Sequence, residues 1–473
     1  MIRYFKSILI FSFFSILISN IILVPQDYTD IQSAINISME NDTIMVNPGT
    51  YIENININNH SIFLISTEGP INTTINGNFN GSVINIDSPG NHVEINGFTI
   101  QHGIGELLSS GSRYGGGIIS HNTALTLDSI IIENNEAFAG GGICIYNSYS
   151  TETESILKNS TIQNNTASEG GGIFIINQSL NIINSYVSQN GMIPFGSGGG
   201  IQALVANINI ESSIIENNQS RFGGGLYIAN SNSHIDKTII SNNISDSNGG
   251  GVWVGSESES VFLETLISDN VADGFGGGVF SYDANIIIDK STITSNIILS
   301  TISGAGIYTD IGNTVINNSI IYFNRLENNG SINENINGSS ANNFSEYDIE
   351  YSNIEGEEEW IPYGIGVISS NPDFANELYH LSETSVCIDA GNPAYTDSDG
   401  TRLDIGKYYY DQSVCDIFGD FNNDNIINIL DIVLIANSIL DNNTYNICND
   451  MNDDSYINVL DIIIIVNIIL NTD

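Results

Sequence analysis

Between Tyr114 and Asn324 two short phrases recur along the chain. Gly-Gly-Gly followed by Ile, Leu or Val begins at Gly115, Gly140, Gly170, Gly198, Gly223, Gly249 and Gly276, and Gly-Ala-Gly-Ile begins at Gly304. An aliphatic residue and two others precede an asparagine that falls at Asn135, Asn165, Asn190, Asn218, Asn243, Asn270, Asn296 and Asn324. These asparagines are 30, 25, 28, 25, 27, 26 and 28 residues apart. Such a period is typical of stacked structural repeats.

Each repeat is predicted to be one coil of strands and turns. Its β-branched residues alternate with polar ones, as in Asn-Ile-Asn-Ile at Asn207 to Ile210, and this pattern fits pleated strands better than paired helices. One coil cannot bury its aliphatic face alone, so coils must stack at the strand spacing of about 4.8 Å. The sequence therefore predicts a mainly β fold, a right-handed parallel β-helix or solenoid.

The two phrases have distinct structural roles in such a solenoid. An asparagine at the same corner of every coil can donate its side-chain amide to the carbonyl of the next, which pairs groups that would otherwise be buried without a partner. Glycine is needed where a turn takes positive φ or where coils approach too closely for a Cβ. The phrase pair resembles the Phe-x-x-Asn and Gly-Gly-Ala-Ile repeats of polymorphic outer-membrane proteins, with Ile or Val in place of Phe.

Composition narrows the classes of partner. The chain has 473 residues, with 54 acidic against 10 basic side chains and a net charge of −44. Binding nucleic acid or an anionic membrane needs clustered Lys and Arg, so neither partner is expected. Four cysteines are too few for a disulfide scaffold.

The N-terminus has the form of a secretion signal. Arg3 and Lys6 precede an apolar run from Ser7 to Ile18, and residues 1–20 are therefore predicted to be a signal peptide. No later stretch reaches the length of a membrane span without polar interruption. The mature protein, with a net charge of −46, is expected to be secreted, extracellular or on a bacterial cell surface.

Residues 21–410 are assigned to the β-helix with a cap at each end. The stretch from Ile22 to Tyr51 predicts a short strand, an amphipathic helix within residues 27–40 that covers the open end, and the first coil. Its short motifs Gln-x-Ala-Ile, Asp-Thr-Ile and Pro-Gly-x-Tyr resemble the start of pectin-lyase-like β-helix proteins. Past Asn324 the period breaks, and residues 325–410 are interpreted as the other cap. The acidic run from Glu355 to Glu359 is interpreted as a solvated surface loop in preference to a ligand site.

Residues 415–473 carry two copies of a calcium-loop pattern. The copies begin at Asp420 and Asp450, and in both copies positions 1, 3, 5, 9 and 12 have oxygen-bearing side chains, the ligand spacing of an EF-hand loop. Position 7 supplies a backbone carbonyl, and each loop runs into an apolar helix, expected at Ile432 to Leu440 and Ile462 to Leu470. The predicted ligands of two calcium ions are Asp420, Asn422, Asp424, Ile426, Asn428 and Asp431 in the first loop, and Asp450, Asn452, Asp454, Tyr456, Asn458 and Asp461 in the second.

This C-terminal pair of loop and helix units resembles a type I dockerin, a small α-helical module that binds a cohesin. The segment from Asp416 to Asp473 has ten acidic residues and no Lys or Arg, so it is expected to fold on metal binding. Position 6 is Asn425 and Ser455 where glycine is usual, and Ser tolerates left-handed geometry less well than Asn, so the second site is expected to be weaker. Export also allows a disulfide between Cys415 and Cys448, which the sequence leaves open.

The dockerin-like module departs from its family at the positions that meet a cohesin. Positions 10 and 11 usually carry small or hydroxylated residues, and here they are Ile429, Leu430, Val459 and Leu460. The partner is therefore either a cohesin-like protein or another cell-surface component, and an apolar docking surface or a contact with the β-helix both stay open.

No catalytic residue can be singled out. The six histidines are scattered, and Arg113, Arg221, Asp269 and Asp273 are interpreted as turn residues near glycine phrases. Asp397, Asp399, Asp404 and Arg402 either hold a cation or form an Arg–Asp pair that fixes the final turn, and the pair is the preferred interpretation. A concentration of carboxylates and aromatics along one face of the coils would indicate a site.

Three functions remain open. The first is a carbohydrate-binding or adhesive scaffold, tethered through the calcium-dependent module. The second is a glycoside hydrolase or polysaccharide lyase, since both the β-helix and the dockerin resemblance imply such enzymes. The third is a purely structural surface rod, because fold alone does not settle function.

Overall fold

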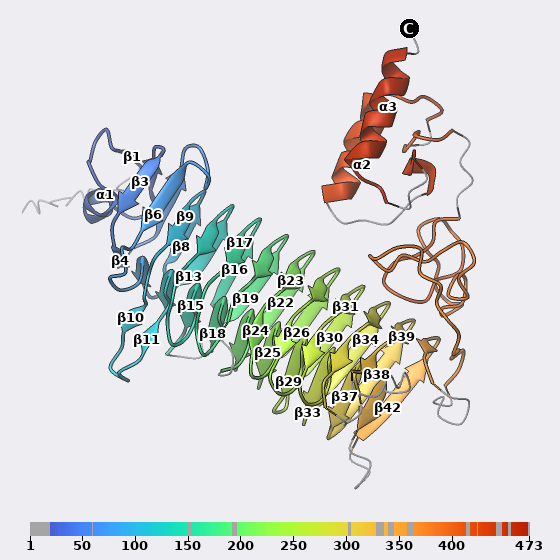
Figure 1. Cartoon of the computed structure of the whole chain (residues 1–473). Helices are drawn as coiled ribbons and strands as arrows, with labels where there is room; N and C mark the ends of the chain where they lie inside the picture. The colour runs from blue at the N-terminus through green and yellow to red at the C-terminus, as the bar shows by residue number, and fades with distance from the viewer. Residues whose placement is uncertain are drawn as a thin grey trace, which may run out of the picture.

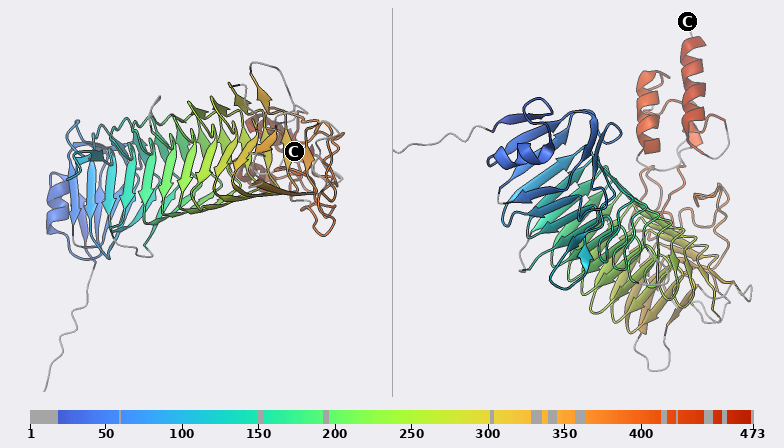
Figure 2. Two further views of the ribbon diagram at one scale, coloured as in Figure 1. Left: turned by 90° about the horizontal axis from the view of Figure 1, so that it is seen from below. Right: turned by 60° about the vertical axis from the view of Figure 1, so that its left-hand side comes forward.

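The computed structural model describes residues 19–58, 60–148, 153–191, 196–300, 304–327, 335–338, 345–356, 364–412, 417–422, 424–440, 447–452 and 456–471. Its strands stack into a parallel β-solenoid built of three long sheets, with 13, 12 and 11 strands (Figure 1). The coils follow one another from the N-terminal to the C-terminal end in a single row (Figure 2). The predicted parallel β-solenoid is confirmed.

The 13-strand sheet contains β1 (Ile21–Val24), β2 (Asp42–Val46), β5 (Ile62–Ser66), β8 (His92–Asn96), β13 (Ala124–Asp128), β16 (Glu154–Lys158), β19 (Ser179–Ile183), β22 (Asn207–Glu211), β26 (Asn232–Asp236), β30 (Glu259–Leu263), β34 (Asn285–Asp289), β38 (Gly312–Asn317) and β42 (Ser345–Glu350). The 12-strand sheet contains β3 (Gly49–Ile52), β6 (Thr73–Asn76), β9 (Thr99–Gln101), β14 (Ile131–Glu133), β17 (Thr161–Gln163), β20 (Tyr186–Ser188), β23 (Ile214–Glu216), β27 (Ile239–Ser241), β31 (Leu266–Ser268), β35 (Thr292–Thr294), β39 (Ile320–Tyr322) and β43 (Asn353–Ile354).

The 11-strand sheet contains β4 (Ile55–Asn58), β7 (Ile84–Asp87), β12 (Ile118–His121), β15 (Ile143–Tyr146), β18 (Ile173–Ile176), β21 (Ile201–Leu204), β25 (Leu226–Ala229), β29 (Val252–Gly255), β33 (Val279–Tyr282), β37 (Ile307–Asp310) and β41 (Ile336–Gly338). Five short strands form a fourth sheet: β24 (Gln219–Ser220), β28 (Ile244–Ser245), β32 (Val271–Ala272), β36 (Ile297–Ile298) and β40 (Arg325–Leu326). The pair β10 (Glu106–Leu107) and β11 (Arg113–Tyr114) is antiparallel.

The asparagine ladder is present at the corner that follows the 12-strand sheet. Each side-chain amide donates to the side-chain oxygen of the asparagine one coil further on, from Asn135 to Asn165 at 3.0 Å through to Asn296 to Asn324 at 2.8 Å. The ladder has one more member than the repeat period predicted, because Asn324 donates its side-chain amide to the side-chain oxygen of Asn335 at 2.8 Å. Asn335 in turn donates to Glu355 at 3.0 Å. Glu355 is therefore a half-buried end of the ladder, and interpreting it as a solvated loop residue was wrong. The remaining glutamates of the run, residues 357–359, lie outside the described residues.

A second ladder, made of hydroxyl groups, was not anticipated from the sequence. It lies at the corner between the 13-strand and 12-strand sheets, where a backbone N–H donates to the hydroxyl of the next coil, as from Ser160 to Ser185 at 3.2 Å and from Ser291 to Ser319 at 3.0 Å. Its members are Ser160, Ser185, Ser213, Thr238, Thr265, Ser291, Ser319 and Ser352, all of them buried. They repeat with the asparagine period, and that was the available signal.

The glycine phrases have both of the expected roles. Gly140 has a φ of +64°, a conformation that disfavours a side chain. A Cβ added to Gly141 would lie 2.5 Å from the carbonyl oxygen of Gly171 in the next coil. The phrase is therefore a turn followed by a close approach between coils.

The interior and its N-terminal cover also agree with the prediction. One continuous aliphatic core fills the solenoid, with Ile, Leu and Val side chains that are almost fully buried. Helix α1 (Ile31–Ile37) lies at the N-terminal end and buries Ile31, Ala34 and Ile35, the face expected from the sequence (Figure 2). Asp30 caps it by accepting the backbone N–H of Ser33 at 2.8 Å.

Residues 364–412 cover more than the end of the solenoid. Ile368 adds a bridge beyond β43, which extends the 12-strand sheet at its end. The chain then returns along the outer face of that sheet, where Leu381, Cys387 and Ile405 pack against Ile320. Lys407 donates its backbone N–H to Thr292 at 3.0 Å, one coil before Ile320. The expected cap thus covers both an end and a flank.

The C-terminal module contains helices α2 (Ile429–Leu440) and α3 (Val459–Asn471), side by side, and a 3-10 turn η1 (Ile447–Asn449) (Figure 1). Both long helices begin three residues earlier than expected. The reason is a capping box, in which Asn428 accepts from Leu430 N–H at 2.8 Å and Asp431 accepts from Asn428 N–H at 2.8 Å. Cys448 is in a disulfide bond, and its expected partner Cys415 lies outside the described residues.

Candidate functional site

A groove of about 670 Å³ lies on the outer face of the 13-strand sheet, across β16, β19, β22 and β26. These four strands are adjacent in the sheet (Figure 1). The groove also takes in the corners where the chain enters the sheet from the 11-strand sheet. We call it the amide groove after its lining residues, Glu154, Asn177, Gln178, Ser179, Val205, Ala206, Asn207, Asn209, Asn230 and Asn232.

Strand alternation places the amides on the outside. In β22 Ile208 and Ile210 are buried, while Asn207 and Asn209 are exposed. The parallel register pairs Asn207 with Asn232 and Asn209 with Asn181, so that exposed amides stand beside one another in neighbouring coils. The ladder asparagines are held inside by stacking, whereas these asparagines face solvent. The alternation in the sequence predicts outward positions for Asn207 and Asn209, and the structure confirms them.

Hydrogen bonds order part of the groove. Asn209 donates its side-chain amide to Asn181 at 2.8 Å, and Asn181 donates to the carboxylate of Glu154. This chain crosses three strands and fixes the orientation of two amides. The side chains of Asn207 and Asn232 have no hydrogen-bond partner within the described part of the chain. Each of them offers a donor and an acceptor to a ligand.

Val205 forms an apolar patch in the amide groove at a strained corner. Its φ is +51°, in the left-handed region that a β-branched residue rarely adopts. The corresponding corner residues Asn177 and Asn230 tolerate this conformation far better. Val205 is 55 % exposed, so burial in the core does not explain the strain. Ile311 has a φ of +64° at the equivalent corner outside the groove, so it is the position of Val205 within the groove that makes it a candidate ligand contact.

Aromatic side chains gather on a different face. Tyr227, Trp253, Phe280 and Tyr308 occupy successive strands of the 11-strand sheet, with ring centroids 4.2, 6.1 and 5.8 Å apart. The rings stack along the solenoid axis, so their faces meet each other and their edges point outward. Carboxylates lie on this sheet as well, since Asp87 contacts His121, whose ring stacks on Tyr146, and Asp310 belongs to the same strand as Tyr308. Glu154 and the amide groove lie on the 13-strand sheet.

In the first predicted calcium loop, backbone N–H groups point at its carboxylates. Asp420 accepts from Asp424 at 3.1 Å and Asn425 at 2.6 Å, and Asp431 accepts from Phe421 at 2.9 Å. Asn425 has a φ of +68°, the left-handed geometry expected at position 6.

The donor set of this loop fits calcium in chemistry. Asp420 is 5 % and Asp431 0 % exposed, and no Lys or Arg follows Lys407 in the sequence. A buried carboxylate without a counterion is costly, and a bound cation would remove that cost. Within the described residues no three His, Cys, Asp or Glu side chains converge on one point, so the calcium ligands remain a prediction.

The second loop repeats the parts of the first that are described. Asp461 accepts from Met451 N–H at 2.8 Å and from Asn458 N–H at 2.7 Å, and Asn458 caps α3 through Leu460. Asp450 and Asp461 are buried. The predicted ligand Asp454 and the position-6 residue Ser455 lie outside the described residues.

Positions 10 and 11 of both loops are solvent-exposed. The exposed fractions are 69 % for Ile429, 56 % for Leu430, 62 % for Val459 and 54 % for Leu460. None of the four packs against the β-helix core clusters. Their exposure leaves an apolar surface at the start of α2 and α3, as one of the open alternatives requires.

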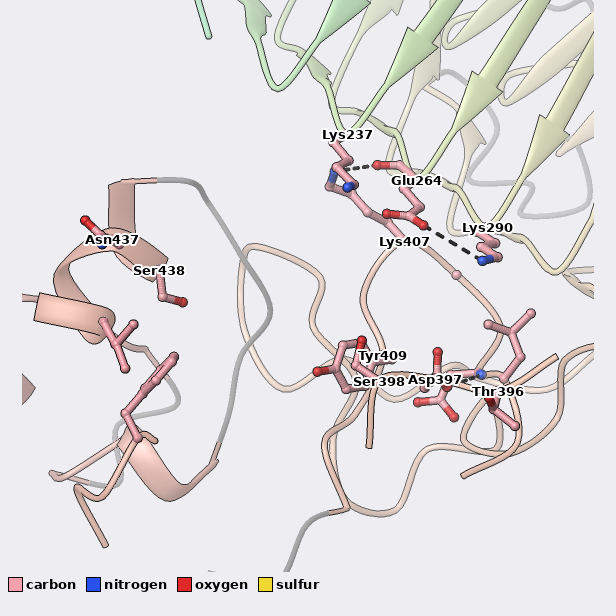
Figure 3. A pocket seen from close by; sticks show the side chains of 15 residues that line it. Lys237, Glu264, Lys290, Thr396, Asp397, Ser398, Lys407, Tyr409, Asn437 and Ser438 are labelled. Atoms are coloured by element: carbon pink, nitrogen blue, oxygen red, sulfur yellow. Dashed lines mark hydrogen bonds and ion pairs between the residues drawn. The ribbon is translucent and has the colours of Figure 1, made fainter. Parts of the chain in front are cut away.

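A second cavity, of about 590 Å³, lies between the returning segment, the corner of the 13-strand sheet and helix α2 of the C-terminal module, which contributes Asn437 and Ser438 (Figure 3). Lys407 donates its ammonium group to the carbonyl oxygen of Glu264 at 2.6 Å, and Lys290 lies 3.9 Å from the Glu264 carboxylate. Burial lowers the pKa of Lys407 to about 8, because desolvation penalises the charged ammonium. These contacts fasten residues 364–412 to the solenoid.

Arg402 does not form the expected ion pair with an aspartate. Its guanidinium donates to the carbonyl oxygens of Gly391 at 2.7 Å and Ala390 at 3.2 Å. The aspartates instead accept backbone N–H groups, as Asp404 does from Tyr410 at 2.7 Å and Asp397 does from Asp404 at 2.7 Å. Hydrogen bonding to the main chain therefore takes the place of the predicted pair in fixing this turn.

No helix of the described residues is long and apolar enough to cross a membrane.

No protein-family model matches the chain, and no curated protein is detectably similar in sequence. Solved structures similar in fold include the pectate lyase Pel9A, with a TM-score of 0.44 and 14 % identity over 83 % of this chain and 96 % of that one. A pectin methylesterase from Aspergillus niger has a TM-score of 0.30 and 14 % identity over 57 % of this chain and 85 % of its own. Carrot pectin methylesterase has a TM-score of 0.28 and 11 % identity over 70 % of this chain and 87 % of its own. The chain is thus a parallel β-helix protein by its own architecture, and its function has to be argued from its own side chains.

Proposed function

We propose that this is a glycan-binding β-helix protein of the cell exterior, whose amide groove takes the ligand and whose C-terminal module tethers it. The observation that carries the binding role is the groove itself, where the amides of Asn207 and Asn232 stand exposed beside the ordered chain of Asn209, Asn181 and Glu154. Ligand sites are concave and combine an apolar surface with a few oriented polar groups. A sugar supplies hydroxyl groups for the amides and a C–H face for Val205.

Tethering rests on the calcium loops and on the exposed apolar surface beside them. Two calcium ions would neutralise the buried carboxylates and hold α2 and α3, with the twelve ligands given by the loop pattern. Ile429, Leu430, Val459 and Leu460 would then meet a cohesin-like protein or another cell-surface component, through an apolar contact in place of the usual hydroxylated one. The acidic composition and the predicted signal peptide favour an extracellular setting.

Affinity electrophoresis on polysaccharide-containing gels tests the binding role. The intact protein should be retarded, and Asn207→Ala combined with Asn232→Ala should weaken binding about tenfold or more, since each lost hydrogen bond is worth about 1 kcal/mol. Asn313→Ala is a matched control, because Asn313 is exposed on the same sheet, outside the groove. Equal retardation of all three proteins would refute the groove as the site.

Chain cleavage is the weaker candidate. Hydrolysis needs two carboxylates that flank the bond, and Glu154 is the single carboxylate among the described residues that line the groove. Size-exclusion chromatography of the polysaccharides after incubation, with and without calcium, distinguishes the two. Shorter products would establish an enzyme. If no polysaccharide of the panel is bound or cleaved, the structural rod is the function that remains.

A further inference from the structure

The class of glycan can be inferred from charge and hydrogen bonding in the amide groove, and this step rests on the proposed function. The groove carries one formal charge, the carboxylate of Glu154, and no Lys or Arg among its lining residues. Lys158, on the same strand as Glu154, is already paired with Asp128 at 3.3 Å. The local field is therefore negative, within a chain whose net charge is −44. An anionic chain placed here would meet repulsion without a compensating cation.

The hydrogen-bonding capacity of Glu154 also favours a neutral ligand over an anionic one. The ionised carboxylate of Glu154 only accepts, so its remaining lone pairs need a donor from the ligand. A sugar hydroxyl donates and accepts, and can therefore bridge Glu154 and an amide such as Asn207. A uronate carboxylate accepts only, so it could not use the remaining lone pairs of Glu154 and would add a second negative charge beside it.

The strained Val205 adds an apolar requirement. Asparagine occupies the equivalent corners at Asn177 and Asn230, where it relieves the left-handed strain. Valine instead presents two methyl groups to the groove, and 55 % of its surface remains open. The C–H face of a neutral sugar ring would cover it, which gives the strained residue a role in binding.

We infer that the amide groove selects a neutral, hydroxyl-rich glycan chain and rejects polyuronates. The basis is the combination of four exposed asparagine amides, one acidic residue, no basic residue, and an apolar side chain held in a strained corner. Rejection of polyuronates distinguishes this groove from an acidic-polysaccharide site, which would need Lys, Arg or a bridging cation.

The full-length protein can be tested against neutral glucan, xylan and mannan and against polygalacturonate and alginate, each with calcium and with chelator. At least one neutral polymer should bind in both conditions, and neither polyuronate should bind in either. Binding to polyuronates and not to neutral polymers would overturn the inference while leaving a glycan-binding function. Binding to none of the polymers would overturn the proposed function itself.

Charge variants locate the selectivity in the groove. Glu154→Lys should weaken neutral-polymer binding about tenfold, by loss of the acceptor, and should raise polyuronate binding. Glu94→Lys is the matched control, because Glu94 lies in β8 of the same sheet outside the groove. Equal gains of polyuronate binding in both variants would show a general charge effect and refute local selection.

Val205→Asn separates the apolar contact from folding. The variant should be more stable to urea, by about 1 kcal/mol, because asparagine relieves the corner strain. It should bind the neutral polymer severalfold more weakly, since it loses the methyl surface. Unchanged binding would remove Val205 from the inferred site.

Discussion

At the scale of single residues, the interior asparagines have a measurable energetic role. Asn243 accepts both the backbone N–H and the side-chain amide of Asn218, at 3.0 and 3.1 Å, and it donates to Ile215 and Asn270. Replacing it by alanine would leave buried groups of Asn218 and Ile215 in the preceding coil without this partner and would remove one donor from Asn270 in the next coil. Each buried group left unpaired costs about 1–3 kcal/mol.

Asn243→Ala should therefore lower the free energy of unfolding by about 3 kcal/mol or more, measured by urea denaturation. Asn313→Ala, at an exposed position with no side-chain hydrogen bond to the described residues, should change it by less than about 0.5 kcal/mol. Equal losses for the two variants would mean that the ladder adds nothing beyond ordinary asparagine packing.

The returning segment contains a carboxyl group whose ionisation should make stability depend on pH. Burial raises the pKa of Asp404 to about 7 and that of Asp397 to about 6, because desolvation disfavours the charged form. The folded state then holds protons that the unfolded state has lost above its ordinary pKa near 3.8. Stability from these groups is full below about pH 4 and is lost as the pH rises through about 7.

The free energy of unfolding of residues 364–412 should therefore fall between pH 4 and pH 7, by up to about 1.4 kcal/mol per pH unit for each group. Asp404→Asn should flatten this slope, and Asp348→Asn, at an exposed position in β42, should not. Limited proteolysis of the segment at matched protease activity would measure it. A slope of the opposite sign in the parent protein would contradict the assignment.

At the scale of secondary-structure elements, the strands and turns were predicted correctly where a residue type repeats for a single physical reason. The asparagine and glycine phrases indicated coils, corners and register, and Ile31, Ala34 and Ile35 indicated the buried face of α1. The hydroxyl ladder was missed because Ser and Thr are common in any loop, so the period of Ser160 and Ser185 had no obvious cause. The return of residues 364–412 along the flank depends on long-range contacts such as Ile405 against Ile320, which no local pattern encodes.

The site was predicted less well than the fold, for the same reason. Asn209 and Asn181 stand side by side on one face only because coils of unequal length keep the strands in register. Val205 could have been found, since it is a β-branched residue at a corner where asparagine usually stands. The calcium ligands could be predicted from spacing alone, because all of them lie within two twelve-residue loops, and they stay a prediction.

Calcium should control the C-terminal helices and leave the solenoid intact. Chelation should unfold α2 and α3, because Asp420, Asp431, Asp450 and Asp461 are buried and the module has no basic side chain. Circular dichroism would follow the loss of helix, and calorimetric titration should resolve two sites. Asp431→Asn should abolish the tighter one and Asp461→Asn the weaker one. Helices that persist in chelator would refute calcium-dependent folding.

At the scale of the whole molecule, the solenoid and the module should act independently. The solenoid buries its own core, and residues 364–412 are fastened to it by Lys407, Tyr379 and Gly406. Among the described residues, the backbone N–H of Glu377 donates to the Tyr456 hydroxyl at 3.5 Å and so links this body to the module. The module also lines the cavity of Figure 3 through Phe421, Leu434, Asn437 and Ser438, so removing it opens that cavity but leaves the solenoid core and the contacts of residues 364–412 in place.

A chain truncated after Gln412 should therefore keep its glycan affinity and its resistance to urea, and lose attachment to the cell surface or complex. Gln412 is a suitable end because its side chain still donates to Asp389 at 2.9 Å and completes the returning segment. Full-length protein with Leu430→Asp and Leu460→Asp is the complementary variant, since it should keep both calcium sites and glycan binding and yet fail to attach. The truncation removes the whole module, so attachment by the truncated chain would refute tethering through it. The charged variant changes only the exposed face of the module, so attachment by that variant would refute the apolar docking surface and leave tethering by the module standing.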